Sequence, residues 1–495
     1  MRTHIPAWSA GICLSVFLGI ALWGNCIEPD FFGYLAYGRY AWENHALPTS
    51  DPFSYLPSYP AWIFHEWLTG VLAYPLYQKL GAWPLQAARY LAGFGAAWLL
   101  YAAARRRGAS AGFAALGLAL IFPTFHDAFP PGLARGVSSF GFALVLFACV
   151  SFEQRPSLLR YFWLPGVFLI WANLHGGFAV GLMLLFLYAG GVFLSGGNPR
   201  RFLVLVAICA AATLVNPYGL RLWQGVFQHA ASPEKEIWEW YSLSRWVASF
   251  GFDKRTLAFS GLLVLFLLSV PSLWRSERTG LWICLFCALL GFFHLRHIPF
   301  FCFSFAVFMP RAMGLAASRG PGRKPAARVA RMVFVAAVAF FVFAVNATYA
   351  YQKAGIAWEQ GSPLALKAPS WRSSVSCSYL YPVEAADYIR DKGLQGNLLC
   401  DMTWGGFFLW KLYPGVKVAM DTRTETVFPA AVRKGYFDFY WVRPGWDRFL
   451  EAYPHDIVVV PSGTPLPGAV VRTGGWRVDY SDPLCAVLVR AEAKE

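Results

Sequence analysis

The sequence is poor in charged residues. Asp, Glu, Lys and Arg make up only 14% of its 495 residues, against about 25% in soluble domains. Hydrophobic residues reach 57% and aromatic residues 18%. Long apolar stretches recur between short polar loops, and each is long enough, or nearly so, to cross a hydrocarbon core of about 30 Å. We therefore exclude an ordinary soluble enzyme and expect a polytopic α-helical membrane protein.

The sequence also lacks a zinc-binding pattern and any repeated segment. The ten cysteines show no paired spacing suited to zinc, and the chain has no internal repeat or low-complexity tract. The tail carries Cys377, Cys400 and Cys485, an odd number that leaves at least one thiol free. The net charge of +15 is concentrated in particular loops, so it reports membrane topology, and no nucleic-acid partner is expected.

The apolar stretches predict about eleven spans. They are 9–27, 84–104, 110–125, 136–152, 161–173, 177–195, 201–216, 256–272, 280–293, 297–312 and 331–350. The segment 66–80 is short, amphipathic and interrupted by Pro75, so we interpret it as interfacial or re-entrant. Alternatively it spans the membrane, and one hairpin then violates the charge rule.

The basic loops indicate the orientation. With eleven spans all of them fall on one side, which the positive-inside rule makes cytoplasmic. These loops contain Arg105–Arg107, Arg155 and Arg160, Arg200 and Arg201, Arg275 and Arg278, and the segment 311–331. The N-terminus then lies in the cytoplasm and the C-terminal tail outside it. The first stretch has no small-residue cleavage site, so we expect a retained signal anchor.

The chain divides into two predicted domains. Residues 1–350 form the membrane domain, with a long first extracytoplasmic loop at 28–83. Residues 351–495 alternate helix and strand signals and predict a soluble extracytoplasmic α/β domain. Its helices are expected at 381–393, 405–415 and 443–454, its strands at 397–401, 416–423 and 456–461, and a terminal hairpin at 476–490.

Polar residues gather on the predicted extracytoplasmic face, where ionisable groups at membrane depth usually mark function. Glu28–Pro29–Asp30 places two carboxylates at the exit of the first span. Either could act as a general base, or the pair could cap the following helix. The other candidates on this face are His65, Glu66, Asp127, Arg135, His175, His294, Arg296 and His297.

Several polar residues also have a simpler structural interpretation. Arg135 could contact lipid headgroups, and His65 with Glu66 could anchor an interfacial helix. The run EKEIWEWYS (234–242) is interpreted as an interfacial surface helix. Asp51 is expected to be a turn residue. In the tail, Trp404–Gly405–Gly406 and Asp421–Thr422–Arg423 could bind an acceptor, or could be a helix start and a strand-end turn, which we favour.

Several motifs in order resemble those of the polytopic GT-C glycosyltransferases, the superfamily of dolichyl-phosphate-mannose mannosyltransferases and aminoarabinose transferases. The motifs are EPDFFGYLAYGRYAWENHALPTSDPFSY (28–55), WIFHEWL (62–68), WANLHGGF (171–178), NPYG (216–219), HLRHIPFF (294–301), WGGFFLWKLYP (404–414) and MDTR (420–423). The likeness runs through nearly the whole chain.

This resemblance implies an enzyme of the bacterial inner membrane. It would move a sugar from a polyprenyl-phosphate carrier to an unknown glycan, lipid or protein acceptor outside the cytoplasm, by a single inverting displacement. Asp30 would be the catalytic base beside Glu28, and Arg135, His175, Arg296 and His297 would bind the donor's phosphate. His65, Glu66, Asp127 and His294 are additional candidates. A divalent metal would also be compatible, and no other cofactor is expected.

The sequence departs from the better-studied relatives at two points. Pro29 separates the two acids, and His65–Glu66 replaces the basic–Pro–Pro pattern of the lipid A-modifying enzymes. The acceptor class therefore does not carry over. Two other functions stay open: a non-catalytic membrane protein whose tail binds envelope partners, and a lipid or solute transporter.

Overall fold

The structure is a computed structural model that describes residues 15–16, 18–132, 134–231, 236–318, 361–373, 377 and 379–491, with scattered positions between 336 and 359. The chain forms two compact units that do not follow chain order. Unit 1 comprises Met1–Gly24, Ala87–Pro217 and Ile237–Gly361. Unit 2 comprises Asn25–Gln86, Tyr218–Glu236 and Ser362–Glu495, so the first long loop packs with the tail.

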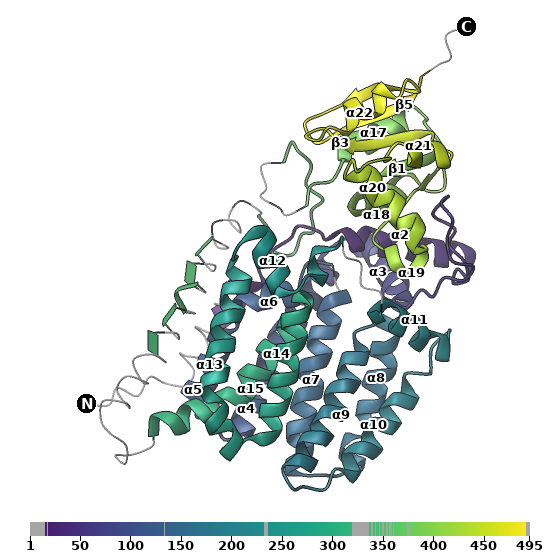
Figure 1. Ribbon diagram of the computed structural model, residues 1–495. Coiled ribbons are helices and arrows are strands. Elements are labelled where there is room, and N and C mark those ends of the chain that lie inside the picture. The colour runs from purple at the N-terminus through teal and green to yellow at the C-terminus, as the bar shows by residue number, and fades with distance from the viewer. Residues whose placement is uncertain are drawn as a thin grey trace. The chain divides into compact units, whose positions relative to one another are not determined.

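Unit 1 is built of helices. Those of its described part are most of α4 (Trp83–Arg106), α5 (Ala111–Leu120), α6 (Phe122–Ala128), α7 (Ala134–Gln154), η1 (Leu159–Tyr161), α8 (Trp163–Leu174), α9 (Phe178–Leu194), α10 (Arg200–Ala212), η2 (Trp238–Trp240), α12 (Leu243–Phe250), α13 (Lys254–Ser276), α14 (Arg278–Phe293), η3 (Leu295–His297) and α15 (Ile298–Ser318). Figure 1 shows α7, α9, α13, α14 and α15 running alongside one another.

A helix coincides with each apolar stretch predicted between 84 and 312. The stretch 110–125 is divided, because Pro123 lies in the first turn of α6 and has no N–H to continue α5. Within the described residues, three segments are long and apolar enough to cross a membrane: Ala134–Gln154, Lys254–Ser276 and Leu295–Leu315. The count of eleven stays a prediction. The stretch 9–27 is described in part and is helical at 15–16 and 18–22, whereas more than half of the stretch 331–350 lies outside the described residues.

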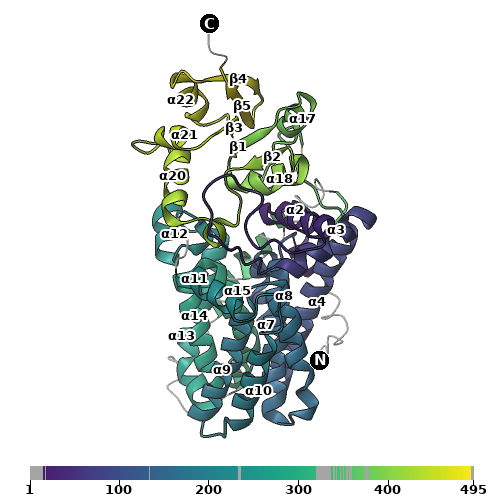
Figure 2. The ribbon, with the colours of Figure 1, turned by 90° about the vertical axis from the view of Figure 1, so that its right-hand side faces the viewer.

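Unit 2 contains a five-stranded mixed sheet in the order β2-β1-β3-β5-β4. Its strands are β1 (Gly396–Cys400), β2 (Val416–Val418), β3 (Ile457–Pro461), β4 (Trp476–Ser481) and β5 (Cys485–Arg490). β1 pairs in parallel with β2 and β3, and β5 pairs antiparallel with β3 and β4. Figure 2 shows these strands side by side. The predicted strands and the terminal hairpin are confirmed, although β2 is shorter than 416–423.

The helices of unit 2 come from both the first loop and the tail. In the described residues they are α2 (Pro29–Asn44), α3 (Trp67–Leu80), α11 (Leu220–Ala231), α17 (Val383–Asp391), α18 (Met402–Leu412), α19 (Thr424–Val427), α20 (Ala430–Tyr440), α21 (Arg448–Ala452) and α22 (Leu466–Arg472). α17 and α18 confirm two predicted helices, and α21 is shorter than the predicted 443–454. α20 was not predicted.

Glycines allow α2 to pack closely against its two neighbours. A Cβ at Gly38 would collide with the backbone carbonyl of Gly70 on α3. A Cβ at Gly406 on α18 would lie 2.8 Å from the backbone nitrogen of Gly33. These close approaches hold the segment that begins with Glu28 and Asp30 between α3 and the tail helix α18.

Candidate functional site

The two predicted catalytic acids lie at the start of α2. Pro29 is its first residue, which suits a helix start because proline has no N–H to leave unpaired. Asp30 lies in the first turn, where the positive end of the helix dipole stabilises a carboxylate. Glu28 precedes the helix in extended conformation and its side chain does not cap it. Both acids are partly exposed.

Tyr34, one turn after Asp30, connects this pair to Glu66. Its hydroxyl donates to Glu66 Oε2 at 2.8 Å. Burial raises the pKa of Tyr34 well above its usual range, and the charges of Glu66, Asp30 and Glu28 raise it further. Tyr34 therefore stays a neutral donor among three carboxylates. His65 Nε2 lies 3.6 Å from Glu66 Oε1, the other oxygen of the carboxylate that Tyr34 binds.

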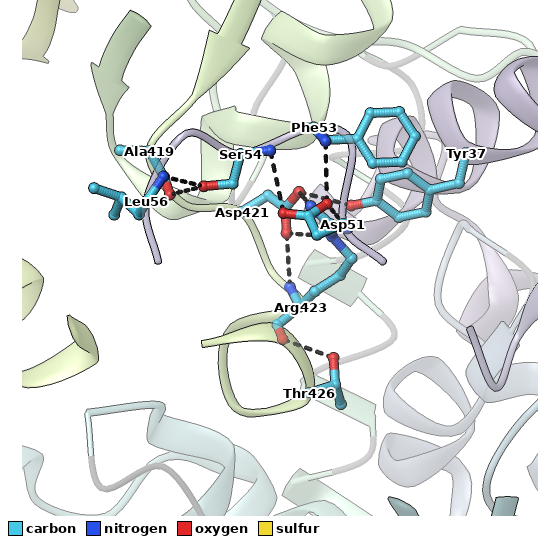
Figure 3. A network of polar contacts seen from close by, with 9 residues as sticks. All are labelled: Tyr37, Asp51, Phe53, Ser54, Leu56, Ala419, Asp421, Arg423 and Thr426. Carbon is cyan, nitrogen blue, oxygen red and sulfur yellow. Dashed lines mark hydrogen bonds and ion pairs between the residues drawn. The ribbon is translucent and has the colours of Figure 1, made fainter. Parts of the chain in front are cut away.

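The first loop is joined to the tail by a buried ion network (Figure 3). Arg423 donates to both carboxylate oxygens of Asp421 and, at 2.7 Å, to Asp51 Oδ1. The side chains of both acids are fully buried, and that of Arg423 is 7% exposed. Tyr37 donates to Asp421 Oδ2 at 3.0 Å. Two carboxylates thus share one guanidinium.

Turn geometry holds both acids of this network in place. Asp51 accepts from the backbone N–H groups of Phe53 and Ser54, and Asp421 accepts from that of Arg423. The two predicted turns are therefore confirmed. The predicted helix start near Trp404 is confirmed too, because Asp401 caps α18 by accepting from Thr403 N. The ion network itself was not predicted.

In unit 1, two predicted phosphate-binding arginines meet on one carboxylate. Arg135, at the start of α7, donates to Glu239 Oε2 at 2.8 Å. Arg296, in η3, lies 3.2 Å from Glu239 Oε1. Its guanidinium also lies 4.3 Å from the ring centroid of Trp240. Paired guanidinium groups of this kind are suited to binding an oxyanion such as phosphate.

Two predicted histidines flank this arginine pair. His294 Nδ1 lies 3.0 Å from the carbonyl oxygen of Trp240, and the His297 ring lies 6.3 Å from the Trp240 ring. His297 Nδ1 is buried and has no hydrogen-bond partner among the residues that the structure describes. A buried polar atom without a partner is costly, so this nitrogen favours a ligand or water at the site.

His175 approaches the same region from the loop between α8 and α9. Its Nδ1 lies 2.6 Å from Ser138 Oγ and accepts from the Gly177 N–H at 3.0 Å. Ser138 lies three residues after Arg135 on α7, so the two share one helix face. Because Nδ1 accepts a hydrogen bond, the neutral ring carries its proton on Nε2. The structure thus brings His175 towards the Arg135 side of the arginine pair.

Sequence reasoning missed Glu239 and Tyr34. Glu239 belongs to the acidic and aromatic run 234–242, whose described part forms only the single turn η2 and not a longer surface helix. Asp127, one of the additional candidates, lies on α6 in unit 1. In the described residues, no group of three or more His, Cys, Asp or Glu is placed to hold a metal ion.

No protein-family model and no curated protein sequence matches the chain. Solved structures do. The archaeal oligosaccharyltransferase AglB from Archaeoglobus fulgidus, in complex with an inhibitory peptide and a dolichol-phosphate, aligns with a TM-score of 0.57 at 11% identity over 92% of this chain and 69% of AglB. ArnT from Cupriavidus metallidurans, bound to undecaprenyl phosphate, aligns with a TM-score of 0.53 at 16% identity over 98% of each chain.

These likenesses extend over nearly the whole chain, the tail included. At such low identity they establish the fold and leave the reaction open. They fit the apolar helices of unit 1. This chain has the GT-C fold of membrane glycosyltransferases.

Proposed function

We propose that the protein is a membrane glycosyltransferase that moves a sugar from a polyprenyl-phosphate carrier to an acceptor outside the cytoplasm. The observation that carries the proposal is the convergence of Arg135 and Arg296 on a single carboxylate, in a chain with the GT-C fold. The aligned AglB and ArnT structures hold dolichol-phosphate and undecaprenyl phosphate. A phosphate on a lipid tail is the ligand that two guanidinium groups in a membrane protein would suit.

Asp30 is the proposed base. Its carboxylate takes a proton from an acceptor hydroxyl, and that oxygen attacks the anomeric carbon of the donor sugar. The bond between this carbon and the phosphate oxygen breaks, so the configuration inverts and the polyprenyl phosphate leaves. Glu28 and Glu66 lie in the same part of unit 2, and their charges act on the same tyrosine, Tyr34, as that of Asp30.

The departing phosphate gains negative charge as the bond breaks. Arg135 and Arg296 supply fixed positive charge, while His175 and His297 supply ring nitrogens that could hydrogen-bond the phosphate oxygens.

The compartment follows from the same proposal. Unit 2 contains a disulfide between Cys26 and Cys377, and disulfides persist in oxidising compartments such as the periplasm. The disulfide therefore supports a position of unit 2 outside the cytoplasm, and we propose that the protein belongs to a bacterial inner membrane. The other two tail cysteines, Cys400 and Cys485, are free and buried.

The test is donor binding and transfer by the purified protein in lipid nanodiscs. Radiolabelled polyprenyl-phosphate sugars are titrated into the wild type, the Arg135→Gln/Arg296→Gln double variant and a control, Arg390→Gln. Arg390 and its partners Asp387 and Asp391 have exposed side chains on α17. We expect saturable binding and transfer by the wild type and the control, and weakened binding by the double variant. Absence of lipid-linked sugar binding in the wild type would instead favour a tail that binds envelope partners.

A further inference from the structure

The carboxylate of Glu239 is paired with the two arginines that the proposed donor's phosphate would need. Glu239 pairs with Arg135 through Oε2 and with Arg296 through Oε1, so each of its oxygens has its own guanidinium. The three side chains come from α7, η2 and η3, which are far apart in the sequence. The exposed fraction of the side chain is 37% for Arg135, 27% for Glu239 and 23% for Arg296. The site is therefore open enough for a ligand to reach the arginines.

We propose that Glu239 is an internal competitor for the phosphate site, a carboxylate that the donor's phosphate displaces on binding and that replaces the product's phosphate on release. This inference rests on the proposed function and adds a residue that tunes donor affinity. Carboxylate and phosphate are the two anions that the planar guanidinium fork recognises with two parallel hydrogen bonds.

The backbone around Glu239 allows this exchange. Its neighbour Trp240 is held in place, because the Trp240 carbonyl faces His294 Nδ1 and the Tyr241 carbonyl accepts from Leu295 N at 3.0 Å. Trp240 also stacks on the Arg296 guanidinium. The Glu239 side chain can therefore rotate away while η2 and the arginine stay in position. His297 Nδ1, buried and without a partner among the described residues, adds a nitrogen that a phosphate could satisfy and Glu239 does not.

The charges of the donor, of Glu239 and of the product phosphate determine which anion the arginines bind. A sugar phosphodiester carries one negative charge, the same as Glu239, so displacement by the donor leaves the charge of the site unchanged. After transfer, the polyprenyl phosphate is a monoester with a charge of about −1.5 to −2 near neutral pH. It is held more tightly by the two arginines than the donor was. The displaced Glu239 side chain stays close to these arginines, competes with the product phosphate for them and speeds its release.

The experiment measures binding of undecaprenyl phosphate to the full-length protein in nanodiscs. Glu239→Gln keeps the shape of the side chain and removes its charge, and Glu239→Ser removes the competing group altogether. The matched control is Glu236→Gln, three residues away, whose carboxylate pairs with Arg443 in unit 2. A double variant, Arg135→Gln/Arg296→Gln, reports whether the lipid uses the arginine pair.

We expect both Glu239 variants to bind undecaprenyl phosphate about two- to thirty-fold more tightly than the wild type, since each partly exposed ion pair is worth at most a few-fold. Glu236→Gln should bind as the wild type does. In transfer assays, Glu239→Gln should show a lower KM for the donor and stronger inhibition by undecaprenyl phosphate.

Unchanged or weaker binding by both Glu239 variants, with normal binding by the wild type, would overturn this inference and make Glu239 a residue that positions the arginines. The proposed function would survive that outcome. If neither the wild type nor any variant binds the lipid phosphate, the donor class is wrong and the inference falls with it.

Discussion

Replacing Arg423 by methionine should release the first loop from the tail. The substitution keeps an unbranched side chain of similar length but leaves the carboxylates of Asp51 and Asp421 buried without a cation. Removing one member of a buried ion pair typically costs about 3–5 kcal/mol, because the remaining charge is uncompensated. The guanidinium also lies 4.5 Å from the ring centroid of Trp62 and 4.7 Å from that of Tyr37, contacts that methionine replaces only in part.

Both Asp51 and Asp421 should contribute to the loss of unfolding free energy in Arg423→Met. Asp421 keeps the hydroxyl of Tyr37, and Asp51 keeps the backbone N–H groups of Phe53 and Ser54. Adding Asp51→Asn to Arg423→Met removes one of the two uncompensated charges. The double variant should therefore be more stable than the sum of the single effects predicts, by about 1–3 kcal/mol.

Hydrogen exchange read by mass spectrometry gives the assay, on the protein in nanodiscs. Peptides that cover 49–56 and 416–428 should exchange faster in Arg423→Met. The control is Arg477→Met, which breaks an ion pair to Asp479 whose arginine is 53% exposed and should change the opening free energy by less than about 1 kcal/mol. Equal protection in Arg423→Met and the wild type would refute the buried-network reasoning.

Further predictions concern unit 2. Burial lowers the pKa of His455 from 6.5 to about 4, so the unfolded chain takes up the proton first and stability falls as the pH drops from about 6.5 to about 4. The loss is at most about 3 kcal/mol, and His455→Gln should abolish it in acid-unfolding curves. Gly406→Leu should separate α18 from α2 and lower the melting temperature, whereas Gly463→Ala, where an added Cβ meets nothing within 4 Å, should not. Alkylation of the unfolded, unreduced protein should leave Cys26 and Cys377 unlabelled, and labelling of both would contradict the disulfide.

Much of the architecture could be predicted from the sequence because its causes are local. An apolar stretch of about 20 residues has few alternatives to a helix in a membrane. Tail strands such as 456–461 are continuous apolar runs bounded by turn residues. The helix α20 could have been found in the same way, since Val432, Tyr436 and Phe439 recur at helical spacing and are buried.

The composite unit 2 and the polar networks could not be predicted in this way. Asp51 and Arg423 are 372 residues apart, and Glu239 is 104 residues from Arg135. A single sequence carries no signal of such pairings. For Asp51 and Asp421 the sequence indicated only a turn. For Glu239 it indicated only a position in an acidic and aromatic run. Asp30 could be predicted as a catalytic candidate from the sequence. The hydrogen bond from Tyr34 to Glu66 is seen only in the structure.

The central claim is that Asp30 is the base of a sugar transfer from a polyprenyl-phosphate carrier. The most direct measurement is a single-turnover transfer in nanodiscs, with donor already bound and acceptor added, in the wild type, Asp30→Asn and the control Asp387→Asn on α17. Our account predicts equal donor binding in all three and a rate that falls about 10²- to 10⁴-fold in Asp30→Asn alone. Transfer by Asp30→Asn at the wild-type rate would contradict it.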